Sequence, residues 1–147
     1  MTPRLVDLLL GHAASLSVPQ PPESGGDYLA GRLGMMALMS VLMAQEAERG
    51  VAARVWENRA VRESLRKAAQ AYDVAFEGRL ALAAAGIDHD LDVSALDRSN
   101  ADLRRLLIGL HETAEVRGDT GLDGDILTLY RAMAHRRRLE FPAAMLA

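Results

Sequence analysis

A regular seam along residues 51 to 76 restricts the fold more than any other feature of the sequence. Its members recur at intervals of 4, 3, 4, 3, 4, 3 and 4 residues and are Val51, Val55, Asn58, Arg62, Leu65, Ala69, Tyr72 and Phe76. Residues three and four apart are neighbours on a helix surface, so this alternation places all of them on one face. We therefore expect a long helix over residues 51–85 that packs against other helices and ends at Gly86.

Asn58 and Arg62 are polar residues on this otherwise apolar face. A buried charge without a partner costs several kcal/mol, so the guanidinium of Arg62 needs an anion or an exit to water. In a structural interpretation, which we favour because structural ion pairs are common, Arg62 extends past its neighbours to water or pairs with a carboxylate such as Glu46 or Glu115, and Asn58 sets the register of packing. In a functional interpretation both side chains donate hydrogen bonds to a carboxylate or phosphate ligand. The ligand-binding residues of that second interpretation are Asn58, Arg62, Glu46, Met39 and Met43.

The rest of the chain also has helical patterns, and no segment alternates with the period of two that a strand requires. The expected parts are an N-terminal amphipathic helix (1–17), a Pro/Gly linker (18–26), a helical bundle domain (27–141) and a C-terminal tail (142–147). Four main helices are expected in the bundle domain, over residues 28–49, 51–85, 98–116 and 125–139. Whether Gly50 breaks or only kinks the helical run is left open. The predicted fold is an all-α bundle of four main helices with a short tethered N-terminal helix.

The most apolar stretch of the chain is "LGMMALMSVLMAQ", residues 33 to 45, which carries no charge. It falls short of the roughly 20 residues needed to span a bilayer, so we do not expect a membrane segment. Because it is apolar on all sides, we expect it to be the most buried helix of the bundle. Its methionines are typical of core gap fillers, and an adaptable lining for an apolar ligand is the alternative.

His111 and Glu115 stand one helical turn apart, a spacing at which an imidazole and a carboxylate can share a metal ion. Glu46 is the third candidate ligand. Ferritin-like di-iron proteins use Glu-x-x-His on two helices, and this sequence has no such motif. The favoured interpretation is a His–Glu pair at the surface or at the boundary of the core, without a metal ion. The metal site is the alternative.

The acidic loop after Gly86 resembles the start of a calcium-binding loop, with aspartates at 88, 90 and 92. The pattern then fails, because Val93 stands where glycine is needed and Ser99 where glutamate is needed. We expect no calcium site there, and we expect Ser94 or Asp97 to cap the following helix.

Few functional classes receive support from the composition. The net charge of −3 gives no general attraction to nucleic acid or acidic lipid, so neither partner is expected. Cysteine is absent, which excludes disulfides and thiolate sites and is compatible with a reducing, cytoplasmic location. The sequence has no G-x-S-x-G, Walker A or G-x-G-x-x-G motif, so no enzyme is indicated and no cofactor is expected. The one basic run, "HRRR" at 135–138, suits a solvated helix C-terminus.

These observations favour a non-catalytic interaction or adaptor protein that forms a homodimer through helical contacts. The alternative is a helical bundle that binds a small ligand through Asn58 and Arg62. A third possibility is a metal-dependent enzyme that uses His111 and Glu115 with Glu46.

Overall fold

The computed structural model describes residues 4, 5, 7–9, 11, 12 and 26–140, and all regular structure among them is helical. The chain forms two compact units, one from Met1–Gly50 with Arg138–Ala147 and one from Val51–Arg137. The predicted all-α bundle is confirmed. The predicted bundle domain of residues 27–141 contributes to both units. In the described part of the chain, no helix combines the length and the apolar character needed to cross a membrane.

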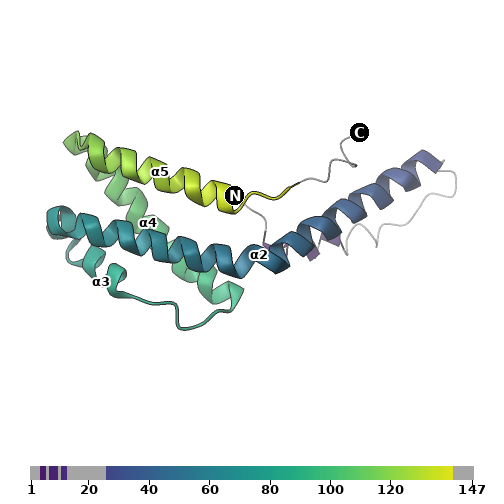
Figure 1. The fold of residues 1–147 in the computed structure, drawn as a ribbon, viewed down its shortest axis with the longest axis horizontal. Coiled ribbons are helices and arrows are strands. Elements are labelled where there is room, and N and C mark those ends of the chain that lie inside the picture. Colours follow the sequence, from purple (N-terminus) through teal and green to yellow (C-terminus); the bar gives the residue numbers. More distant parts are fainter. Residues whose placement is uncertain (1–3, 6, 10, 13–25, 141–147) are drawn as a thin grey trace. The chain divides into compact units, whose positions relative to one another are not determined.

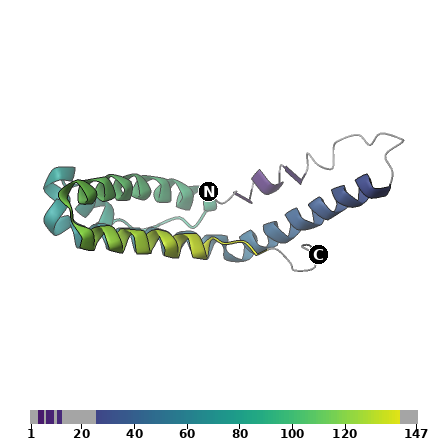
Figure 2. The same cartoon turned by 90° about the horizontal axis from the view of Figure 1, so that it is seen from above.

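The first two predicted main helices are one element, α2 (Gly26–Tyr72), which continues through Gly50 and belongs to both units. The second unit adds a single turn of 3₁₀-helix, η1 (Asp73–Phe76), and α3 (Arg79–Ala85). It is completed by α4 (Val93–Arg117) and α5 (Thr120–Arg136). In both views α4 and α5 form an antiparallel hairpin (Figures 1 and 2).

The core of the second unit lies where the C-terminal part of α2, η1, α3, α4 and α5 meet. Its buried members are Val61, Leu65, Ala68, Tyr72, Phe76, Leu80, Ala84, Leu103, Leu107, Leu110, Ile126 and Met133. The seam predicted from sequence faces this core from Asn58 to Phe76, while Val55 is half-buried and Val51 is exposed. Hydrophobic periodicity therefore identified the inner face of this part of α2 correctly.

The predicted helix 51–85 is interrupted, because the chain reverses direction after Phe76. Glu77 and Gly78 both have positive φ, of 55° and 78°, which is incompatible with a continuing α-helix. The Asp73 carboxylate then accepts hydrogen bonds from the backbone N–H groups of Leu80 (2.9 Å) and Ala81 (3.2 Å) at the start of α3. The reversal brings Leu80 back into the core, whereas a straight helix would carry this side chain away from the core.

Helix α4 begins earlier than predicted, at Val93, and its N-cap residue is Asp92, so the predicted caps at Ser94 and Asp97 are wrong. The reason is Leu96, which is fully buried and whose N–H bonds to the carbonyl of Asp92 (2.9 Å). The extra turn of helix is needed to place this leucine.

Helix α5 begins at Thr120, five residues before the predicted start, and ends at Arg136. The stretch "RGDTGLDGD" suggested a loop because it contains three glycines. Only Gly118 acts in a turn, with φ 67°, as the C-cap of α4. Asp119 caps α5 by accepting from the N–H of Leu122 (3.0 Å), and its other oxygen accepts from the Tyr72 hydroxyl (2.7 Å).

In the first unit the described residues of the predicted N-terminal helix are helical from position 5 to 12. Leu8 is buried, and a Cβ at Gly11 would come within 2.9 Å of the Met39 methyl carbon, so this segment packs on α2. The side chain of Gln45 exchanges two hydrogen bonds with the backbone of Glu140, at 2.6 and 2.8 Å. The predicted tail (142–147), and the predicted linker (18–26) apart from Gly26, lie outside the described residues.

Candidate functional site

The two polar residues of the seam belong to a network of side chains inside the second unit. Arg62 on α2 donates two hydrogen bonds to the carboxylate of Asp88, at 3.0 and 2.7 Å, and a third to the hydroxyl of Ser99 at 2.9 Å. Asn58 donates to Asp88 (3.2 Å) and to the carbonyl of Leu96 (3.3 Å). The network therefore ties α2 to the loop before α4 and to the first turns of α4.

Asp88 is the anion that Arg62 requires, and the predicted pairing with Glu46 or Glu115 is wrong. The bidentate geometry is that of a strong arginine–carboxylate pair. Hydrogen bonds from Arg62 hold the pKa of Asp88 below its ordinary value of 3.8, in spite of the opposing effect of burial. Sequence reasoning missed Asp88 because it lies in an irregular loop, where periodicity gives no information about which way a side chain points.

A shallow groove of about 410 Å³ lies beside this ion pair. Arg59, Arg62 and Arg66 contribute to its lining, together with Gly86 and Asp88. Both end nitrogens of Arg62 are already used within the chain, and its Nε is buried with no hydrogen-bond partner. The predicted ligand-binding role of Asn58 and Arg62 stays a prediction. Its other members, Met39, Met43 and Glu46, lie in the first unit.

A second buried ion pair went unnoticed in the sequence. Glu57 is only 1% exposed, and both of its carboxylate oxygens accept hydrogen bonds from Arg137, each at 2.7 Å. Asn100 donates to the same carboxylate (3.2 Å) and to the Asn58 side chain (3.0 Å), which joins the two networks. Glu57 lies outside the 4–3 seam, and no local signal predicts a partner 80 residues away.

The basic run at 135–138 is therefore not simply a solvated helix end. Arg137 reaches the buried Glu57, and the guanidinium of Arg136 stacks over the ring of Trp56, 4.2 Å from its centroid. Cation–π contacts of this kind favour arginine over lysine because the planar group lies flat on the ring. Two of the four basic residues thus hold the end of α5 against α2.

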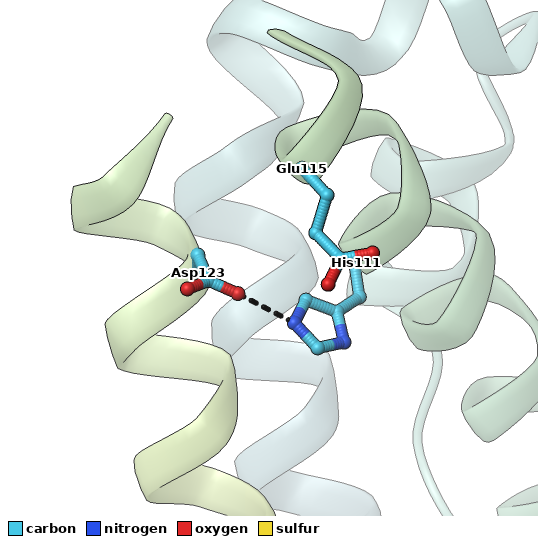
Figure 3. A group of neighbouring side chains, drawn as sticks. All are labelled: His111, Glu115 and Asp123. Carbon is cyan, nitrogen blue, oxygen red and sulfur yellow. Dashed lines mark hydrogen bonds and ion pairs between the residues drawn. The ribbon is translucent and has the colours of Figure 1, made fainter. Parts of the chain in front are cut away.

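His111, Glu115 and Asp123 form a cluster at the turn end of the α4–α5 hairpin (Figure 3). Each offers a metal-ligating atom, and these atoms lie within 4.8 Å of one another. Nε2 of His111 is 2.7 Å from a carboxylate oxygen of Asp123. The sequence singled out His111 and Glu115 but missed Asp123, because α5 was predicted to begin two residues after it. Glu46, the predicted third ligand, is not a member of this cluster.

The apolar run of α2 is not the most buried helix, contrary to prediction. Every described large apolar side chain from Leu29 to Met43 retains contact with solvent, and Met35 is 55% exposed. Gly31, Met35, Leu38 and Leu42 recur at intervals of 4, 3 and 4, the same alternation as a packed seam. We call these four residues, with the adjacent Gly34, the open seam. A Cβ at Gly31 or Gly34 would have no described atom within 4 Å.

No protein-family model, curated protein or solved structure matches this chain.

Proposed function

We propose that the protein is a non-catalytic helical interaction protein that self-associates as a dimer through the open seam of α2. The observation that carries this proposal is the exposure of the most apolar segment of the chain. A monomer that leaves Met35 55% exposed, and Leu38 and Leu42 in partial contact with solvent, retains an apolar surface of the kind that marks protein interfaces. Covering each large apolar side chain contributes roughly 1.5–3 kcal/mol.

A second copy of the chain is the partner that the shape of the open seam suits. The seam carries small residues at its N-terminal end, Gly31 and Gly34, and large ones toward its C-terminal end, Leu38 and Leu42. In an antiparallel two-fold pair, the large end of one copy lies against the small end of the other. A two-fold contact of this kind uses the same patch on both subunits and closes after two copies.

The two glycines support close approach of another helix. Glycine within a helix costs about 0.5–1 kcal/mol relative to alanine, and the described part of this chain places nothing against Gly31 or Gly34 that would require it. A backbone packed closely against them in the dimer accounts for their presence. We also propose a cytoplasmic location, which the absence of cysteine supports.

The test is the oligomeric state of the full chain and of one variant, Gly34→Leu, by analytical ultracentrifugation over a range of concentrations. We expect the unmodified chain to dimerise with a Kd near or below about 1 μM, which corresponds to about −8 kcal/mol. The leucine occupies the space that Leu38 of the second copy requires, so we expect the variant to be monomeric. Because no described atom of the chain occupies that space, we expect the variant to keep its helical content by circular dichroism.

Gly124→Leu is the matched control. Gly124 is also a helical glycine with no described atom within 4 Å of a Cβ, but it lies on α5 in the second unit. We expect this variant to dimerise like the unmodified chain. A monomeric unmodified chain, or a Gly34→Leu variant that dimerises as well as the control, contradicts the proposal.

A further inference from the structure

The cluster of His111, Glu115 and Asp123 has the geometry of a small metal site built into one hairpin. His111 and Glu115 lie one turn apart on α4, and Asp123 faces them from the first turn of α5 (Figure 3). The turn between the helices is held by the C-cap Gly118, whose N–H bonds to the carbonyl of Glu115 (3.0 Å). All three side chains therefore project from one helical hairpin, and Tyr72 of α2 also holds its turn through the hydrogen bond to Asp119 (2.7 Å).

The two carboxylates of the cluster, Asp123 and Glu115, form no ion pair with lysine or arginine among the described residues, and the Glu115 carboxylate has no hydrogen-bond partner there. Within the described part of the chain, the one polar contact of the Asp123 carboxylate is with His111. Two carboxylates placed beside one imidazole repel each other, and a divalent cation removes that repulsion.

The types of ligand indicate which cation fits. Calcium and magnesium take six or more oxygen ligands, whereas an imidazole nitrogen suits zinc and its neighbours among the transition metals. Three protein ligands with a water molecule as the fourth form a tetrahedral zinc site with one open position. The rings of His111 and Tyr130 pack edge to face with their centroids 5.7 Å apart, and this contact orients the imidazole.

A metal ion can reach the cluster from solvent, and the ligands can move to the spacing that the ion requires. The side chains of His111 and Asp123 are 18% and 34% exposed, and Glu115 is on the surface, so an ion reaches them from solvent without opening the core. Zinc holds nitrogen and oxygen ligands at about 2.0–2.2 Å, which places them roughly 3.4 Å apart. Rotation of the exposed Glu115 side chain brings the third ligand to that spacing.

We propose that His111, Glu115 and Asp123 bind one Zn²⁺ ion, which clamps the α4–α5 hairpin at its turn. Binding replaces the hydrogen bond between His111 and Asp123 by two bonds to the metal, and any proton on the ring nitrogen used is released to solvent. This site lies in the second unit and is independent of the proposed dimer contact in the first.

The experiment is isothermal titration of the metal-free full chain with ZnCl₂ at pH 7.5. We expect one ion per chain, and an increase in melting temperature when zinc is present. Glu115→Gln is the main variant because the residue is exposed and its replacement does not disturb the fold. We expect its zinc affinity to fall at least tenfold, and the affinity of Asp123→Asn to fall similarly.

Glu112→Gln is the matched control, an exposed glutamate on the same helix beside His111. Its zinc affinity should equal that of the unmodified chain. His89 and His135 are exposed and remain in every variant, so adventitious binding to surface histidines would persist unchanged in all of them. Absence of zinc binding, or equal affinity in Glu115→Gln, Asp123→Asn and the control, overturns the proposal.

Discussion

The buried pair of Glu57 and Arg137 gives the sharpest test of how the second unit is held together. Replacing Arg137 with methionine keeps an unbranched side chain but removes both hydrogen bonds of 2.7 Å to a carboxylate that is 1% exposed. Removing one partner of a buried ion pair costs about 3–5 kcal/mol, because the other charge stays desolvated. Arg137 is 18% exposed and Asn100 still donates to Glu57, so we expect the free energy of unfolding to fall by about 3 kcal/mol, the lower end of that range.

The measurement is urea unfolding followed by circular dichroism and by the fluorescence of Trp56, the single tryptophan. Glu57→Gln combined with Arg137→Met removes both charges but keeps an oxygen for Asn100. We expect this double variant to lose only about 1 kcal/mol of unfolding free energy, about 2 kcal/mol less than Arg137→Met alone, because no buried charge is left without a partner.

Arg131→Met, at an exposed position on α5, is the control and should change stability by less than about 0.5 kcal/mol. The slope of unfolding free energy against urea should stay the same in every variant. If Arg137→Met costs less than about 1 kcal/mol, the carboxylate is hydrated and our description of a desolvated pair is wrong.

Three further outcomes are expected. Hydrogen bonds from Arg62 lower the pKa of Asp88, so this pair stabilises the fold above pH 3.8 and is lost as pH falls through the lower folded value. Asp88→Asn should therefore flatten the decline of unfolding free energy below pH 3.8, and an unchanged decline would contradict this. Gly124→Ala adds a methyl group that meets no described atom within 4 Å, so it should raise the free energy of unfolding by about 0.5–1 kcal/mol in urea. Gly118→Ala, at φ 67°, should lower the same free energy by about 1 kcal/mol. Leu107→Ala, at a fully buried position, should lower the free energy of unfolding by about 2–5 kcal/mol and the melting temperature with it. A loss of unfolding free energy below about 1 kcal/mol would contradict the placement of Leu107 in the core.

The candidate sites were predicted in part. His111 and Glu115 were identified from the sequence because residues four apart on one helix lie next to each other on its surface. Asp123 was missed because its position depends on where α5 begins, and the glycines around it indicated a loop. Asp88 and Glu57 were missed for a related reason, since each is brought to its partner by the way separate elements pack.

Hydrophobic periodicity determined the all-helical class and the seam from Asn58 to Phe76. These features follow from the sequence alone because side-chain direction within a helix repeats every 3.6 residues whatever surrounds it. The tertiary structure decided the rest. Leu80 and Leu96 are buried only because the chain turns at Glu77 and α4 starts at Val93, and the burial of those side chains outweighs weak local preferences. The pairing of Glu57 with Arg137 and the exposure of the apolar run in α2 likewise depend on which elements meet, and no local pattern encodes that.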